Sequence, residues 1–210
     1  VASIGSGTGV VSGNAAGTVM ITYTMPGGCT SLWPFTVNPM PVAITGAGAV
    51  CVGSSITLAN TSTGGTWSSS NPALGSVGSA SGVVSGVSAG GITISYTLPG
   101  GCYVTHAVTV NPLPAAIMGL PVVCVNATTT LTNATSGGVW SSSDVSLATI
   151  GSSTGIVTGV SAGYPTFTYT IPTGCYVTIA ATVNPLPPNQ PVTGGGAYCS
   201  GAAGSTVGLN

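Results

Sequence analysis

The sequence predicts an all-β protein made of tandem β-sandwich domains, and three observations carry this prediction. First, the sequence repeats itself: Cys29, Cys102 and Cys175 stand 73 residues apart, as do the Asn-Pro pairs at Asn38 and Asn111. Second, short runs of alternating apolar and polar residues follow one another between glycine turns, without helical periodicity. Third, the chain is 43% hydrophobic and nearly uncharged, which is unlike a disordered segment and requires a buried core.

The Asn-Pro pairs set the predicted domain boundaries. Residues 38–110 and 111–183 are two complete repeats that agree at about half of their positions. Residues 1–37 correspond to the C-terminal half of a domain, and residues 184–210 to the N-terminal strands of a further one. Each repeat begins with Asn-Pro-X-Pro, which we interpret as a stiff linker because proline favours extended backbone.

Seven short strands are expected in each repeat. The clearest is 92–98, where Ile92, Ile94 and Tyr96 alternate with polar residues, and the turn Pro99-Gly100-Gly101 leads from it into the last strand, 103–110. The five earlier strands of the second repeat are expected within 50–53, 56–58, 64–70, 74–77 and 83–84. Seven short strands in 73 residues predict an immunoglobulin-like β-sandwich, and repetition predicts a linear array of them.

Aromatic side chains are expected to supply much of the core, because a small sandwich has little other volume to bury. These residues are Trp67, Tyr96, Trp140, Phe167 and Tyr169.

Two segments of the second repeat resemble the bacterial Ig-like group 2 domain. They are Gly-Gly-Thr-Trp-Ser-Ser-Ser-Asn-Pro (Gly64 to Pro72) and Gly-Val-Val-Ser-Gly-Val-Ser-Ala-Gly-Gly-Ile-Thr-Ile-Ser-Tyr (Gly82 to Tyr96). With the Cys-Val-Gly-Ser, Gly-Gly-Cys-Tyr and Asn-Pro-Leu-Pro elements, the whole chain is similar to tandem repeats of long surface proteins in Bacteroidota. This resemblance implies a stalk, adhesin or extracellular-fibre module, and it brings no catalytic residues.

The composition excludes several classes of function. The sequence has 0 Lys+Arg, 1 Asp+Glu and 1 His, so neither a phosphate-binding surface nor the lysine of a nucleotide-binding loop is present. No apolar run is long enough to span a membrane. A net charge near zero favours self-association, or a surface covered by glycan. A chain without a cleavage site for trypsin-like proteases suits an extracellular location, at the surface of a bacterium or beyond it.

Six cysteines predict disulfides and no metal site, since no CxxC pair occurs. They are Cys29, Cys51, Cys102, Cys124, Cys175 and Cys199. A bond between Cys51 and Cys102 within one domain is disfavoured: a strand of about seven residues, about 23 Å long, would separate them, whereas bonded Cα atoms lie within about 7 Å. We therefore expect Cys51 to pair with Cys175 of the next domain. Cys124 and Cys199 would then pair beyond the chain, with Cys29 and Cys102 of a following copy.

No residue qualifies as catalytic. The single histidine, His106, corresponds to Trp33 and Ile179 in the neighbouring repeats, so a packing role on the last strand is expected. The single carboxylate, Asp144, corresponds to Asn71, which predicts a turn role that both side chains can perform. We expect neither an enzyme nor a bound cofactor.

Three Asn-X-Ser/Thr triplets are candidate glycosylation sites: Asn60, Asn126 and Asn133. The alternative is chance, because a chain rich in serine and threonine produces such triplets often.

The predicted function is structural: a repeat unit of an extracellular filament or cell-surface stalk that assembles end to end. The alternative is an adhesin that recognises a glycan or another cell surface. The chain starts and stops inside a domain, which is expected either of a window on a longer array or of a subunit whose tail completes the head of the next copy by strand complementation. Both alternatives predict a filament. The expected partner is the protein itself, as a head-to-tail homopolymer, and covalently attached glycans are a further candidate.

Overall fold

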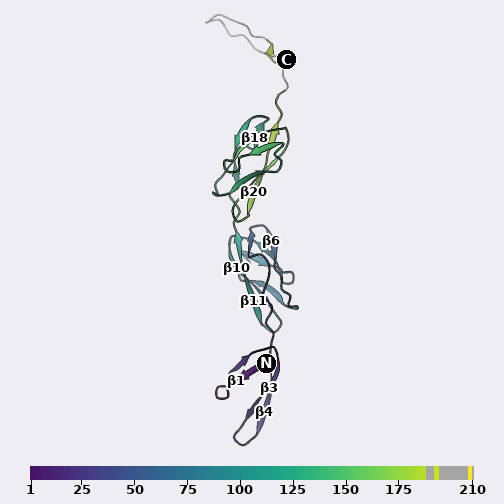
Figure 1. Cartoon of the computed structure of the whole chain (residues 1–210), viewed down its shortest axis with the longest axis vertical. Helices are drawn as coiled ribbons and strands as arrows, with labels where there is room; N and C mark the ends of the chain where they lie inside the picture. The colour runs from purple at the N-terminus through teal and green to yellow at the C-terminus, as the bar shows by residue number, and fades with distance from the viewer. Residues whose placement is uncertain (188–191, 194–207, 210) are drawn as a thin grey trace. The chain divides into compact units, whose positions relative to one another are not determined.

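The structure, a computed structural model, describes residues 1–187, 192–193 and 208–209 (Figure 1). These residues form strands and no helix, which confirms the all-β prediction, and accordingly they contain no helix that could cross a membrane. The chain divides into two compact units, residues 1–113 and 114–210.

The second repeat folds into the seven strands that the sequence predicts. They are β5 (Ala49–Cys51), β6 (Ser55–Thr57), β7 (Thr66–Ser69), β8 (Gly75–Val77), β9 (Val83–Gly86), β10 (Gly90–Thr97) and β11 (Tyr103–Asn111). One sheet has the order β5-β11-β10-β7 and the other the order β6-β9-β8. All neighbours are antiparallel except β5, which pairs in parallel with the end of β11. This arrangement is an immunoglobulin-like sandwich.

The core of this sandwich lies on the faces that the alternation predicts. Ile92, Ile94 and Tyr96 of β10 are buried, while the residues between them are not. Trp67 of β7 packs against Tyr96 with ring centroids 4.7 Å apart at an interplanar angle of 54°. Such a tilted pair contributes about 1 kcal/mol beyond its buried area.

The third repeat, in the second unit, has the same architecture. Its strands are β12 (Ile117–Met118), β13 (Val122–Cys124), β14 (Thr128–Thr130), β15 (Thr132–Asn133), β16 (Val139–Ser142), β17 (Ala148–Ile150), β18 (Ile156–Gly159), β19 (Thr166–Thr170), β20 (Tyr176–Ala180) and β21 (Thr182–Asn184). Trp140 and Tyr169 repeat the tilted aromatic pair, again with centroids 4.7 Å apart. Phe167 is buried beside them, so the predicted aromatic core is confirmed in both repeats.

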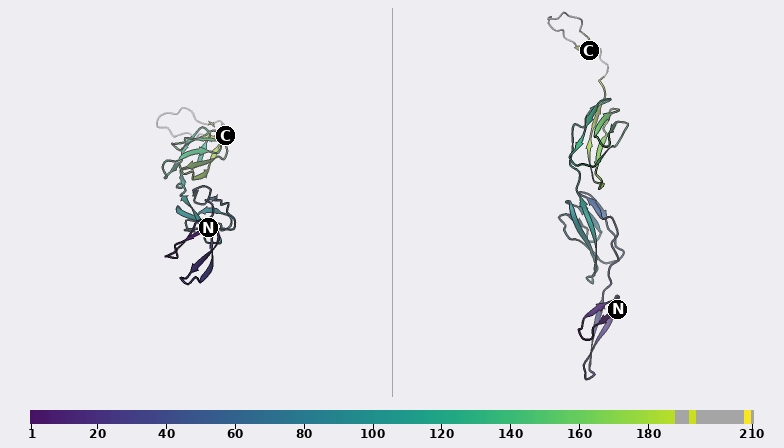
Figure 2. Two further views of the ribbon diagram at one scale, coloured as in Figure 1. Left: turned by 60° about the horizontal axis from the view of Figure 1, so that its bottom comes forward. Right: turned by 60° about the vertical axis from the view of Figure 1, so that its left-hand side comes forward.

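Residues 1–37 contain only four strands. They are β1 (Ala2–Ile4), β2 (Val11–Gly13), β3 (Gly17–Thr24) and β4 (Thr30–Val37). Figures 1 and 2 show them in purple as two pairs, β1 with β2 and β3 with β4. One repeat later these strands correspond to β8, β9, β10 and β11, so strands equivalent to β5, β6 and β7 are missing from this segment.

The second proline of each predicted linker is part of a packed domain. Pro41 and Pro114, the second proline of each Asn-Pro-X-Pro, are buried. The Asn60 side chain donates to the carbonyl oxygen of Val42 at 2.7 Å, which holds the segment after Pro41 against its own domain. Each domain therefore begins to pack at the second proline, earlier than a free linker would allow.

Candidate assembly site

The core-facing side of residues 1–37 is exposed. Val19 and Ile21 are only partly buried, whereas their counterparts Ile92 and Ile94 in the second repeat are buried. The contrast is largest for Tyr23, which is 69% exposed where Tyr96 is 5% exposed. This face is open because residues 1–37 hold no strands equivalent to β5, β6 and β7, which complete the two sheets of the second repeat.

Between its two strand pairs, this half-domain forms an open groove. The groove has a volume of about 390 Å³ and is lined mainly by Ile4, Val11, Val19 and Ile21. No ionised side chain lies within residues 1–37, so the groove offers apolar contact and the hydrogen bonds of hydroxyl and backbone groups.

In the half-domain, β2 and β4 also each have one edge that is unpaired among the described residues. In the second repeat, β5 pairs with the end of β11 in the register Thr109 to Ala49, Val110 to Val50 and Asn111 to Cys51. The equivalent edge of β4, ending at Val37 and Asn38, pairs with β3 on its other side only. An edge of this kind presents backbone N–H and C=O groups to any further strand.

The cysteines fall into two states. Cys51 and Cys175 are disulfide-bonded, as predicted for these two residues, and Cys175 is completely buried. Cys29, Cys102 and Cys124 carry free thiols, which excludes the disfavoured bond from Cys51 to Cys102. Cys199 lies outside the described residues.

The free thiol of Cys102 lies against the end of the half-domain. Its Sγ is 3.7 Å from the carbonyl oxygen of Asn38, and the Asn38 side chain donates to the carbonyl oxygen of Gly100 at 3.0 Å. Asn38 corresponds to Asn111, the residue that stands opposite Cys51 in the pairing of β5 with β11. Cys102 therefore sits next to the position that a strand like β5 would occupy on β4.

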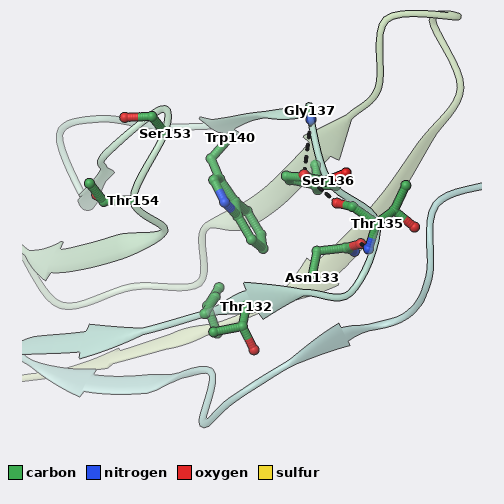
Figure 3. A pocket seen from close by; sticks show the side chains of 11 residues that line it. Thr132, Asn133, Thr135, Ser136, Gly137, Trp140, Ser153 and Thr154 are labelled. Carbon is green, nitrogen blue, oxygen red and sulfur yellow. Dashed lines mark hydrogen bonds between the residues drawn. The ribbon is translucent and has the colours of Figure 1, made fainter.

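A second feature, present in both complete repeats, is a shallow hollow beside the buried tryptophan. In the third repeat it has a volume of about 310 Å³, and Figure 3 shows the Trp140 ring between the loop with Ser153 and Thr154 and the segment from Thr132 to Gly137. The equivalent hollow beside Trp67 has a volume of about 380 Å³.

The tyrosine hydroxyl beside each hollow already has hydrogen-bond partners. The Tyr169 hydroxyl donates to the carbonyl oxygen of Thr135 at 2.6 Å and accepts from the N–H of Gly138 at 2.9 Å. Trp140 itself is 7% exposed. The hollow thus offers a ligand little aromatic surface, and its tyrosine hydroxyl is already engaged.

His106 has the packing position that the sequence predicts. It lies on β11 directly opposite buried Ile94, and its Nε2 is buried with no hydrogen-bond partner among the described residues. No group of three or more metal-ligating side chains occurs in the part of the chain that the structure describes.

Asp144 has the predicted turn role. Its Oδ1 accepts from the hydroxyl of Ser146 at 2.6 Å and from the Ser146 N–H at 2.9 Å, and these bonds lower the pKa of the exposed carboxyl. Asn71, its counterpart, accepts in the same way from the N–H of Ala73 at 3.1 Å. The turn role explains why a carboxylate stands at this position, without any catalytic role.

The three candidate glycosylation sites differ in accessibility. Asn60 and Asn133 are half-buried, and their amide nitrogens donate to the carbonyl oxygens of Val42 and Ala115. Asn126 is exposed in the turn after β13, with a positive φ of 65° where the second repeat has Gly53. Glycosylation stays a prediction, and Asn126 is the most accessible of the three.

No protein-family model matches the sequence, and no curated protein matches it either. Among solved structures, the chain is similar to a C-terminal intimin fragment in complex with the intimin-binding domain of the translocated intimin receptor. The TM-score is 0.46 and the sequence identity 16%, and the match covers 70% of this chain and 65% of the fragment. It is also similar to domains 4 and 5 of the S-layer protein SbsC, with a TM-score of 0.34, 19% identity, and coverage of 71% and 100%.

A third similar structure is mouse cadherin-23 EC22-24, with a TM-score of 0.30, 12% identity, and coverage of 80% of this chain and 73% of that one. The chain spans about two thirds of the intimin fragment. At these identities and TM-scores the likeness concerns the fold alone, and it carries no argument about function.

Proposed function

We propose that the protein is a non-enzymatic structural component of an extracellular filament or cell-surface stalk of a bacterium, assembled end to end from Ig-like domains of the group 2 type. The observation that carries this proposal is the repetition of one sandwich: residues 38–110 and 111–183 form corresponding strands and contain the same buried pair of a tryptophan and a tyrosine. A series of copies of one domain presents the same surfaces again and again, which suits end-to-end assembly into a long structure.

The composition supports the same proposal. With a formal net charge of −1 over 210 residues, copies of this chain repel one another hardly at all. Disulfide bonds at Cys51 and Cys175 suit an oxidising location outside the cytosol. A glycan coat, attached at Asn126 or at the many hydroxyl side chains, would keep such a surface hydrated.

The alternative of an adhesin rests on the hollows beside Trp67 and Trp140. Their tryptophans are 7% exposed, and the neighbouring tyrosine hydroxyls are already paired, so a glycan would find little stacking surface there. The structural role is therefore the better supported of the two.

Sedimentation velocity of the purified chain under oxidising conditions tests the proposed function. We expect species heavier than the 20.0 kDa monomer whose proportion rises with concentration. A single 20.0 kDa species at every concentration up to about 100 μM, well above the range of a stable assembly contact, would rule out self-assembly as the function.

A further inference from the structure

We propose that Asn126 carries an N-linked glycan, whereas the triplets that begin at Asn60 and Asn133 hold the first residues of their domains in place and stay unmodified. This inference rests on the extracellular location in the proposed function, and it assigns the modification to one amide nitrogen. All three triplets have the pattern Asn-X-Ser/Thr, so the sequence alone does not separate them.

The triplet of residues 60–62 is bonded to the start of its own domain. The Asn60 Nδ2 donates to the carbonyl oxygen of Val42 at 2.7 Å, and the Ser62 hydroxyl accepts from the N–H of Val42 at 3.0 Å. The Asn60 Oδ1 accepts from the N–H of Ser62 at 2.9 Å. The amide and the hydroxyl that define the pattern are therefore both engaged.

The triplet of residues 133–135 makes the same contacts in the third repeat. The Asn133 Nδ2 donates to the carbonyl oxygen of Ala115 at 2.6 Å, and the Thr135 hydroxyl accepts from the N–H of Ala115 at 2.9 Å. The Asn133 Oδ1 accepts from the N–H of Thr135 at 2.9 Å. Because the two repeats agree in all three bonds, both triplets have one structural role: they hold the residue that follows the second proline of the linker.

These contacts continue into the turn before the strand with the buried tryptophan. The Tyr96 hydroxyl donates to the carbonyl oxygen of Ser62 at 2.6 Å, and the Tyr169 hydroxyl donates to that of Thr135 at 2.6 Å. The asparagine and the hydroxyl residue of both triplets are half-buried. A sugar on either asparagine would need the space in which the first residues of the domain pack, so it would disrupt this network.

Asn126 and Thr128 differ from the other triplets in each of these respects. Both residues are exposed, and neither side chain makes a hydrogen bond among the described residues. The turn between β13 and β14 is held by backbone groups: the N–H of Asn126 donates to the carbonyl oxygen of Gly159 at 2.9 Å, and the N–H of Ala127 to that of Cys124 at 3.0 Å. The amide and the hydroxyl of this triplet are thus accessible to a glycosyltransferase.

The second repeat shows that this turn does not require an asparagine. Gly53 stands at the corresponding position with a φ of 78°, against 65° for Asn126. Glycine adopts such a φ without strain, and asparagine tolerates it. A Cβ at Gly53 would meet no atom within 4 Å apart from its chain neighbours, so a side chain in this turn points into open space. The asparagine therefore adds an accessible amide with room for a sugar around it.

The modification is a single group transfer. A glycosyltransferase takes the sugar from a donor whose leaving group is a pyrophosphate ester of a nucleotide or a lipid. The bond from the sugar C1 to the pyrophosphate oxygen breaks, the bond from C1 to the Asn126 Nδ2 forms, and the amide gives one proton to a base of the enzyme. The electron pair of the broken bond leaves with the pyrophosphate, so the transfer needs no oxidant or reductant.

Peptide mapping of the protein from its natural source tests the proposal. The chain is digested with pepsin, since it has 0 Lys+Arg for trypsin, and the peptides are fragmented by a method that keeps the sugar bond intact. We expect a sugar on Asn126 and none on Asn60 or Asn133. An unmodified Asn126, or a sugar on either of the other two asparagines, would overturn the proposal.

Sedimentation of the same material separates this inference from the proposed function. A protein that assembles but has no sugar on Asn126 would refute the glycan and leave the structural role standing. A protein that carries the sugar on Asn126 and stays monomeric would refute the structural role alone.

Three substitutions, made in the producing organism, test the acceptor site. Asn126→Gly introduces the residue of the second repeat, so the turn should fold as it does at Gly53 while the sugar is lost. Thr128→Ala keeps the asparagine, removes the hydroxyl and should also abolish the modification. Thr130→Ala, at another exposed threonine of β14, is the matched control and should keep the sugar. Equal modification of Thr128→Ala and Thr130→Ala would contradict the assignment.

A matched pair in the third repeat tests the structural role of the other triplets, in a chain produced without a glycosylation system. Asn133→Asp replaces the donating Nδ2 by an oxygen that faces the carbonyl oxygen of Ala115. We expect it to raise the unfolding equilibrium constant of the third repeat by about 10-fold or more, measured by hydrogen exchange of β16 and β19 with mass spectrometry. Asn126→Asp should change this constant little. Equal effects of the two substitutions would overturn the distinction between the triplets.

Discussion

His106 shows how much freedom the repeat leaves at a single position. Three repeats place Trp33, His106 and Ile179 at the same point of the last strand. The Nε2 of the histidine is buried without a hydrogen-bond partner among the described residues, whereas Trp33 is exposed and Ile179 has no polar side-chain atom. A buried, unpaired polar group costs about 1–3 kcal/mol, so the position favours an apolar side chain.

We therefore expect His106→Ile to raise the free energy of unfolding of the second repeat by about 1 kcal/mol, because it removes the unpaired Nε2 and keeps an apolar body. Urea unfolding followed by tryptophan fluorescence measures the change. Ile179→His is the matched reverse and should lower the stability of the third repeat by a similar amount. A loss of stability in His106→Ile would show that the imidazole makes a contact of its own.

Asp144 and Asn71 show that a charged and an uncharged side chain can have the same role in the repeat. Both side chains accept the N–H two residues ahead, and the carboxylate adds only a hydroxyl contact from Ser146. The turn needs an oxygen acceptor and no ionised group, which explains why one repeat can carry the carboxylate while another carries an amide.

At the level of the elements, β10 and its copy β19 each hold in place the turn that precedes the strand with the buried tryptophan, which is β7 or β16. The Tyr96 hydroxyl accepts from the N–H of Gly65 at 2.9 Å and donates to the carbonyl oxygen of Ser62 at 2.6 Å. A Cβ at Gly65 would lie 2.4 Å from the tyrosine ring, so only glycine permits this close approach. The turn therefore depends on the Tyr96 hydroxyl, and the close approach of the tyrosine ring depends on the glycine at position 65.

Tyr96→Phe should lower the free energy of unfolding of the second repeat by about 1–3 kcal/mol, because the turn loses two hydrogen bonds and the ring stays buried. Hydrogen exchange of the turn amides, measured by mass spectrometry, should quicken. Tyr23→Phe is the control: its side chain is 69% exposed and has no such turn, so unchanged exchange is expected there. Equal protection of the turn in Tyr96→Phe and in the unmodified chain would contradict the role given to the hydroxyl.

The strands could be predicted from the sequence because their signals are local. The alternation around Ile94 and the glycines that flank each strand place all seven elements of the second repeat. The side-chain contacts of Asn60 could not be predicted in this way. Its hydrogen bond to Val42 spans 18 residues and serves a proline segment that the sequence alone presents as a linker.

The exposed face of residues 1–37 was partly predictable. Aligning the repeats shows that this segment holds only half of a domain, but the sequence does not say whether its strands form alone. The structure places β1 to β4 in the pairings of a complete domain, with the apolar face left open. The thiol of Cys102 against Asn38 had no local signal at all, because the two residues are 64 positions apart.

At the scale of the whole molecule, two complete copies of one sandwich follow each other in a chain with almost no charge. Each copy covers its core with its own first strands and fills it with the same pair of a tryptophan and a tyrosine. The proposed structural role rests on this repetition and on the low net charge, because weakly charged copies repel one another little.

Electron microscopy of the purified chain under oxidising conditions tests this central claim most directly. The proposed end-to-end assembly predicts unbranched filaments whose length grows with the protein concentration. Isolated short particles at every concentration up to about 100 μM would contradict it.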